Sequence, residues 1–213
     1  MRDISLYKKF GKRGLDFTFA IIGLVFAVVP MAVIAVAIKV TDKGPVFFRQ
    51  VRIGKNGKEF KIYKFRSMKV GAPIARRIPN PDDHITKIGK FLRASSLDEV
   101  PQIFNIITGE MSFIGPRPVP AVEKITMDAR RKNGAITLRP GITGWAQING
   151  RDEMTEETRA RYDGEYIHKI GFAFDATIVA KTVLSVITKD GYTEVNSLNQ
   201  EPKTHFVTKD NRS

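Results

Sequence analysis

The first pattern along the chain is an unbroken apolar stretch from Phe17 to Ile38 that contains no charged residue. A helix rises about 1.5 Å per residue, so a straight helix of this length is long enough to cross the hydrocarbon core of a bilayer. Proline removes a backbone donor and clashes with the preceding turn, so Pro30 predicts a kink or a break within the stretch.

Four arrangements compete for this stretch: a straight span, a re-entrant hairpin, a cleaved signal peptide and a buried core helix. The stretch is longer than the apolar region of most signal peptides, and core helices rarely remain uncharged for so long. Basic residues cluster on both sides of it, within 1–16 and 39–55. Basic flanks favour the cytoplasm, so a hairpin that keeps both flanks inside is favoured. A straight span stays open, because proline kinks also occur in true spans.

A strand-like pattern follows the apolar stretch. Pro45–Arg52 and Phe60–Phe65 are the two expected strands. Between them lies Asn56-Gly57, a pair of residues that favours tight turns. The sequence therefore predicts a small β-hairpin.

Helical periodicity dominates the remainder of the chain, interrupted by segments rich in proline and glycine. The helices are expected at residues 85–93, 97–107, about 121–132, 155–169 and 173–188, with irregular segments at 69–85, 115–120 and 139–144. The predicted fold is α+β and mostly helical. It comprises an N-terminal re-entrant membrane helix-break-helix at 1–40, a cytosolic body at 41–190 with a small β-hairpin and surface-lying helices, and a polar tail at 191–213. These parts form one functional domain.

Composition narrows the range of partners. The 213 residues include 35 Lys and Arg against 22 Asp and Glu, which gives a formal net charge of +13. Such an excess attracts nucleic acid, anionic lipid or phosphorylated substrates. The chain has no cysteine, which excludes disulfides, thiolate metal sites and a cysteine nucleophile.

The segment from Ser96 to Gln102 carries two adjacent carboxylates, Asp98 and Glu99, near an expected helix start. Adjacent carboxylates can hold Mg²⁺, or one can attack phosphorus while the other assists. The alternative is structural, because Ser96 with Glu99 fits a capping box and Asp98 could itself be the N-cap. The two interpretations are compatible.

Several arginines lie beside predicted turns or at the ends of predicted elements. Guanidinium groups bind phosphate oxygens in a bidentate manner, although a solvated basic surface explains any single arginine equally well. Arg117 and Arg139 are flanked by prolines or glycines, which favours a rigid placement. The set comprises Arg66, Arg93, Arg117, Arg139 and Arg151.

Taken together and in order, these blocks resemble the bacterial sugar transferases of the monotopic phosphoglycosyl transferase type, in their small form that consists of the catalytic core only. The resemblance is carried by Lys12–Asp16, the apolar stretch with Pro30, Gly44–Gln50, Tyr63–Met68, Ser96–Gln102, Gly109–Pro118 and Arg139–Arg151. Each block alone is a weak signal, whereas their shared order is specific.

The resemblance implies a reaction and a set of site residues. A phosphosugar passes from a UDP-sugar to a polyprenyl phosphate, usually undecaprenyl phosphate, with release of UMP and with Mg²⁺ as cofactor. Asp98 is implied as the nucleophile of a covalent aspartyl-phosphosugar intermediate, and Glu99 as a metal ligand or base helper, so that both belong to the metal site. The implied phosphate or uridine contacts are Lys64, Arg66, Arg93, Arg117, Arg139, Gln147 and Arg151. The implied membrane element is a re-entrant helix broken at Pro30.

The same resemblance implies a place in the cell. The protein is expected in membrane lipid at the bacterial inner membrane, with the catalytic body on the cytoplasmic face, at the first membrane step of capsule, exopolysaccharide, O-antigen or glycoprotein glycan assembly. The sugar is left open, and so is a homodimer. Two rival functions are a membrane-tethered basic protein that binds nucleic acid and a non-catalytic scaffold of a polysaccharide assembly complex. No nucleic-acid partner is expected, because no recognised binding motif is present.

Overall fold

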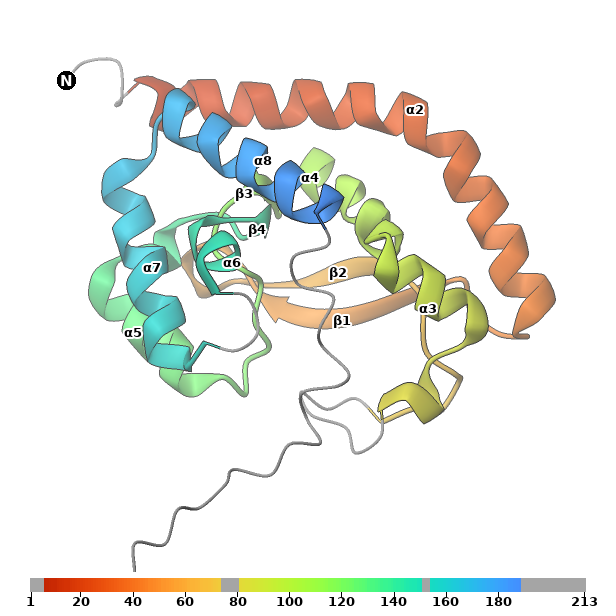
Figure 1. Cartoon of the computed structure of the whole chain (residues 1–213). Helices are drawn as coiled ribbons and strands as arrows, with labels where there is room; N and C mark the ends of the chain where they lie inside the picture. The colour runs from red at the N-terminus through yellow and green to blue at the C-terminus, as the bar shows by residue number, and fades with distance from the viewer. Residues whose placement is uncertain (1–5, 74–80, 151–153, 189–213) are drawn as a thin grey trace, which may run out of the picture.

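The computed structural model describes residues 6–73, 81–150 and 154–188 (Figure 1). A short π-helix, Tyr7–Gly11, leads into helix α2 (Lys12–Thr41), which is followed by strands β1 (Phe47–Ile53) and β2 (Glu59–Phe65). The later elements are α3 (Lys87–Ala94), the 3₁₀ helix η4 (Leu97–Gln102), α4 (Ile103–Thr108), β3 (Ser112–Ile114), α5 (Lys124–Asn133), β4 (Gly141–Thr143), α6 (Trp145–Gly150), α7 (Glu156–Lys169) and α8 (Phe172–Ile187). Three short 3₁₀ turns are η2 (Lys55–Gly57), η3 (Pro81–His84) and η5 (Ala135–Thr137).

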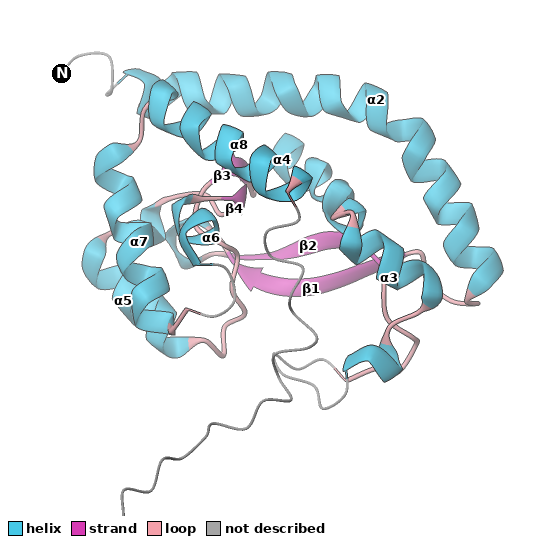
Figure 2. Cartoon of the chain, viewed as in Figure 1, coloured by secondary structure: helices cyan, strands magenta, loops and turns pink. Residues whose placement is uncertain are grey.

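Figure 2 shows helices surrounding small sheets, which confirms the α+β, mostly helical class. The predicted hairpin is also confirmed. Strands β1 and β2 pair antiparallel from Phe47 opposite Phe65 to Ile53 opposite Glu59. Asn56 and Gly57 both adopt positive φ angles, 57° and 77°, and so supply the turn that their types favour.

Helix α2 is the one described helix that is long and apolar enough to cross a membrane. The chain stays helical through Pro30, so the expected break is a bend within a single helix. Figure 1 shows α2 running above the body and then turning down its side. The helix-break-helix prediction is therefore corrected to one bent helix, because the backbone tolerates the lost donor of Pro30 without leaving the helical conformation.

Both halves of α2 pack against the same body. In the first half, Ala20 is fully buried in a cluster with residues of β2 and α4. In the second half, Met31 and Ile38 pack with Phe65 of β2 and Leu92 of α3. The outer face of the helix carries exposed apolar side chains along its length, including Phe26 at 76% exposure. Helix α2 therefore has one face committed to the body and an apolar face turned away from it.

A second sheet was not predicted. Strands β3 and β4 pair in parallel, with Ser112 opposite Gly141 and Ile114 opposite Thr143. The segments 115–120 and 139–144 were expected to be irregular, yet strand β4 begins inside the second and β3 ends just before the first. A Cβ atom on Gly115 would collide with the carbonyl of Arg139, so the two backbones can meet only because glycine stands there.

The N-terminal end of α2 is tied to helix α8 through Asp175, which is 3% exposed. Its carboxylate accepts hydrogen bonds from the hydroxyls of Tyr7 and Tyr166, each at 2.7 Å, and from Lys12 Nζ at 2.6 Å. One buried carboxylate thus joins the start of the apolar helix to the last helix of the body.

We expect Asp175→Ala to lower the stability by about 3–5 kcal/mol, because it leaves the Lys12 ammonium without its buried partner. Thermal unfolding in detergent, followed by the fluorescence of Trp145, measures this. The matched control is Asp128→Ala, which removes only an exposed pair with Arg131 and should change stability by about 0.5 kcal/mol or less. Equal melting temperatures for the two variants would contradict the role of Asp175.

Candidate active site

The carboxylate pair lies in the 3₁₀ helix η4, and its local geometry shows that capping is not its task. Ser96 precedes η4 in a left-handed conformation, φ 56°, and its side chain makes no capping hydrogen bond. The capping-box prediction is therefore wrong, since Glu99 reaches back only through its backbone N–H to the carbonyl of Ser96. A left-handed serine costs about 1–3 kcal/mol, and such strain is concentrated at functional sites.

Glu99 is paired with Lys64, which projects from strand β2. The distance from Lys64 Nζ to Glu99 Oε1 is 2.5 Å, and both side chains are partly exposed. Burial by itself would raise the pKa of Glu99. The charge and hydrogen bond of Lys64 outweigh burial and, together with Arg117 and Gln102, hold the pKa of Glu99 below its ordinary value. Glu99 therefore stays ionised.

Asp98 is the opposite case. Burial raises its pKa above the ordinary 3.8, and the negative charge of Glu99 adds to this, while Lys64 and Arg93 act against it. The guanidinium of Arg93 is held in place by a hydrogen bond from its Nε to Ser67 Oγ at 2.9 Å. Two adjacent carboxylates thus have different environments, a common mark of sites where they have different tasks.

Arg52 is a site residue that the sequence analysis missed. From strand β1 it donates to the carbonyl of Pro118 at 3.3 Å and to Gln50 Oε1 at 2.5 Å. Its pKa is lowered, first by burial and then by the positive charge of Arg117, while Glu123 and Glu99 act in the other direction. Its buried Nε has no hydrogen-bond partner among the described residues. Two neighbouring guanidinium groups, one with an unused donor, favour an anionic ligand.

The structure places the other predicted contact residues in two groups. Lys64, Arg93 and Arg117 lie close to the carboxylate pair. The positive charges of Lys64 and Arg93 lower the pKa of Asp98, and those of Lys64 and Arg117 lower the pKa of Glu99. Arg66 is buried instead, and donates to the carbonyl of Asp42 at the end of α2. Arg139 donates from Nε to the carbonyl of Gly109, at the end of α4, at 2.8 Å. In the structure, these last two arginines bond backbone carbonyls.

Gln147 lies in α6, close to Gly144. Both polar atoms of its amide are buried and have no hydrogen-bond partner within the described part of the chain. A buried amide with an unused donor and acceptor is compatible with a contact to a ligand. Arg151, also predicted as a contact, is outside the described residues.

The metal-binding capacity of the site is limited to the carboxylate pair. No group of three or more histidine, aspartate or glutamate side chains gathers anywhere in the described residues. Mg²⁺ does not need such a cage, because it is commonly bound by one or two carboxylates together with substrate phosphates and water. Asp98 and Glu99 fit that mode of binding, with a phosphorylated substrate supplying the other oxygens.

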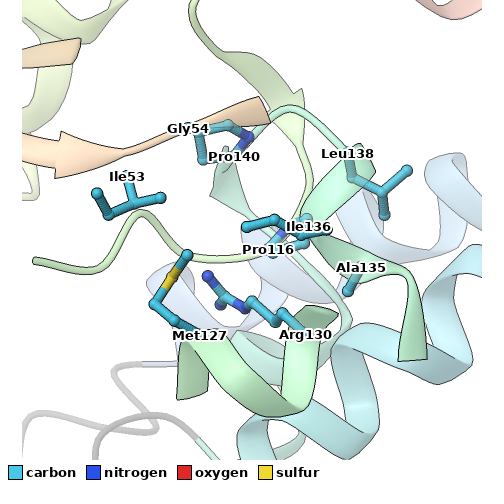
Figure 3. A pocket seen from close by; sticks show the side chains of 9 residues that line it. All are labelled: Ile53, Gly54, Pro116, Met127, Arg130, Ala135, Ile136, Leu138 and Pro140. Atoms are coloured by element: carbon cyan, nitrogen blue, oxygen red, sulfur yellow. The ribbon is translucent and has the colours of Figure 1, made fainter. Parts of the chain in front are cut away.

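Two cavities lie near these elements. The one in Figure 3 is enclosed by residues such as Ile53, Met127 and Arg130 and has a volume of about 10 Å³, room for a single water molecule. The other has a volume of about 280 Å³ and includes Glu99 in its wall. Only the second is large enough to hold part of a substrate.

The family model described as "Bacterial sugar transferase" matches residues 7–189. The chain belongs to this family. The resemblance found in the sequence is thereby confirmed.

Three relatives illustrate the range of this family. The chain is 42% identical over 186 residues to the UDP-glucose:undecaprenyl-phosphate glucose-1-phosphate transferase of Xanthomonas campestris pv. campestris, covering 81% of the chain and 38% of that relative. It is 38% identical over 192 residues to the UDP-N-acetylgalactosamine-undecaprenyl-phosphate N-acetylgalactosaminephosphotransferase of Aeromonas hydrophila, covering 85% and 45%. It is 34% identical over 190 residues to the uncharacterized sugar transferase EpsL of Bacillus subtilis (strain 168), covering 89% and 94%. The chain thus spans less than half the length of the first two.

We expect Arg52→Gln to weaken the binding of a diphosphate anion about 10- to 100-fold, as measured by titration calorimetry with UDP as the probe. The reason is the loss of a charge-assisted hydrogen bond to a phosphate, which contributes about 1.5–3 kcal/mol. Arg49→Gln is the matched control, since Arg49 lies on the same strand but is exposed and stacks on Tyr63. Unchanged affinity in Arg52→Gln, or an equal loss in both variants, would rule out this role.

Proposed function

We propose that the protein transfers a phosphosugar from a UDP-sugar to a polyprenyl phosphate such as undecaprenyl phosphate, with release of UMP. The observation that carries this proposal is the carboxylate pair, Asp98 and Glu99, surrounded by cationic side chains beside an apolar helix. The names of two relatives support both the donor and the acceptor. Such a reaction is a membrane step in the assembly of capsule, exopolysaccharide, O-antigen or glycoprotein glycans.

The chemistry proceeds in two displacements at one phosphorus. A carboxylate oxygen of Asp98 attacks the β-phosphorus of the donor and forms a P–O bond, while the bond to the bridging oxygen breaks and UMP leaves with the electron pair. A phosphate oxygen of the acceptor then attacks the same phosphorus and frees Asp98. Because the intermediate is covalent, the soluble donor reacts first and the lipid acceptor reacts in a second step.

The neighbouring cationic side chains stabilise the negative phosphate charge that shifts during this reaction. Phosphoryl transfer depends mainly on positioning and on stabilisation of phosphate charge. Arg52 and Arg117 lie beside Glu99, where they can bind the diphosphate, and Arg93 lies beside Asp98. Lys64 keeps Glu99 ionised, and Asp98 and Glu99 would hold Mg²⁺, which neutralises phosphate charge when bound.

The same proposal includes the membrane topology. Helix α2 enters and leaves the bilayer on one face, the cytoplasmic face of the inner membrane, with its bend near Pro30 at the deepest point. Support comes from the packing of both halves of α2 on the same body, because a straight span would carry its far half away from a body that remains on one side. The basic flanks of the helix favour the same face.

Asp98→Asn should reduce UMP release from UDP-sugars about 10³-fold or more, because an amide cannot act as the nucleophile. The measurement is UMP release in membranes with polyprenyl phosphate across a panel of UDP-sugars, which also identifies the sugar. Radiolabel from the sugar should remain on the wild-type protein when the acceptor is omitted, and not on Asp98→Asn. Asp128→Asn, at an exposed position, is the control. Full activity in Asp98→Asn would refute the mechanism.

Chelation of Mg²⁺ should abolish the reaction. UMP release by the wild-type protein is expected to fall to background in excess EDTA and to return when Mg²⁺ is added beyond the chelator. Glu99→Gln should need more Mg²⁺ for half-maximal rate than the wild type. Undiminished activity in EDTA would remove Mg²⁺ from the proposal.

Topology is accessible because the chain has no native cysteine. Single cysteines replace Lys9 and Lys55, both exposed and on opposite sides of α2. In intact cells a membrane-impermeant maleimide should label neither, and after permeabilisation it should label both. Labelling of just one in intact cells would establish a straight span instead.

A further inference from the structure

A cavity of about 280 Å³ separates helix α2 from the catalytic body. On the helix side, its wall is formed by Gly23 and Ala27, which lie one turn apart on the same face. On the body side, its wall is formed by Val100, Ile103, Phe113 and Ile142. The space is therefore apolar on both sides and lies between the segment proposed to enter the bilayer and the segment that carries the carboxylates.

Two small residues of α2 border the cavity, between positions where the helix packs closely on the body. One turn before Gly23, Ala20 is fully buried against the body. A Cβ atom on Gly23 would lie 3.0 Å from Ile103 Cδ1, so a larger side chain there would press against Ile103 in the wall of the cavity. The cavity is partly open, and an open apolar surface beside a membrane-type helix is suited to a hydrocarbon chain.

The two ends of the cavity differ in chemistry. The polar residues in its wall are Ser96 and Glu99, and Glu99 is the group bonded to Lys64 beside Asp98. The other boundary is α2, whose remaining faces carry exposed apolar side chains such as Val25 and Phe26. A ligand that fits both ends has a hydrocarbon tail and a polar head, and a phosphate head there needs Lys64 or a metal ion on the carboxylates to offset the charge of Glu99.

We infer that this cavity holds the first isoprene units of the polyprenyl phosphate acceptor, and that Gly23 and Ala27 set its width; the inference rests on the proposed function. A cavity of about 150 Å³ accommodates a six-carbon ring, so the observed volume has room for about two five-carbon units. The rest of the lipid remains in the bilayer. The acceptor phosphate then lies at the Glu99 end, where it can attack the phosphorus held by Asp98.

The test fills the cavity from the helix side with Gly23→Leu and, separately, Ala27→Leu. We expect the KM for polyprenyl phosphate to rise at least tenfold in each variant, with the KM for the UDP-sugar within twofold of wild type. Val25→Leu is the matched control, because Val25 lies between the two positions but is 68% exposed; both KM values should stay unchanged. An unchanged acceptor KM in both filled variants, or an equal rise of both KM values, would overturn the inference.

A second measurement uses the unmodified protein and does not depend on turnover. A polyprenyl phosphate with a diazirine on its first isoprene should crosslink, on illumination in membranes, to peptides that contain Gly23 and Ala27 or Val100 and Ile103. Excess unlabelled polyprenyl phosphate should compete, and phosphatidic acid should not. Crosslinks confined to other segments would overturn the inference. A wild-type protein that crosslinks as expected but releases no UMP from any UDP-sugar would refute the proposed function and leave the lipid site standing.

Discussion

The contact between helix α2 and the body is the constraint on which the remaining structure depends. An apolar helix that touches the body with only one of its ends leaves the depth of the catalytic groups undefined. Here Ala20 is buried near one end, and Met31 and Ile38 are buried towards the other. Asp175 fixes the start of the helix to α8 through Tyr7 and Lys12. The carboxylate pair is thereby held at a set distance from the apolar face.

Within that frame, the electrostatics of the site come from elements distant in sequence. Lys64 from β2 and Arg117 from the loop after β3 keep Glu99 ionised, while burial acts on Asp98 in the opposite direction. Arg52 from β1 adds a second guanidinium beside Arg117. Positive charge concentrated in this way is unfavourable by itself and becomes favourable when a diphosphate is bound, so the arrangement is suited to ligand binding more than to stability.

The small residues of α2 connect these two features. Gly23 and Ala27 line an apolar cavity whose wall also includes Glu99. The helix is then more than an anchor, because one face contacts the body, another is exposed and apolar, and a third borders the proposed path of the lipid.

The sequence by itself determined what depends on neighbouring residues. The length and polarity of Phe17–Ile38 predicted the apolar helix, and Asn56-Gly57 predicted the hairpin turn. Asp98 and Glu99 are adjacent in the chain, so their pairing needed no tertiary information. The predicted helices begin and end within a few residues of the observed ones, because a helix with one buried face has apolar residues at regular intervals in the sequence.

Tertiary structure decided what depends on partners far apart in the chain. Nothing local reveals that Ser112–Ile114 and Gly141–Thr143 meet as a parallel pair, because each strand is only three residues long. Arg52 was missed because it lies in a strand and not beside a turn. Arg66 and Arg93 look alike in the sequence, and only the structure shows Arg66 bonded to the carbonyl of Asp42 and Arg93 beside Asp98. The local pattern favoured a capping box at Ser96, but Lys64 engages Glu99 instead, since a charged partner across the fold outcompetes a backbone N–H.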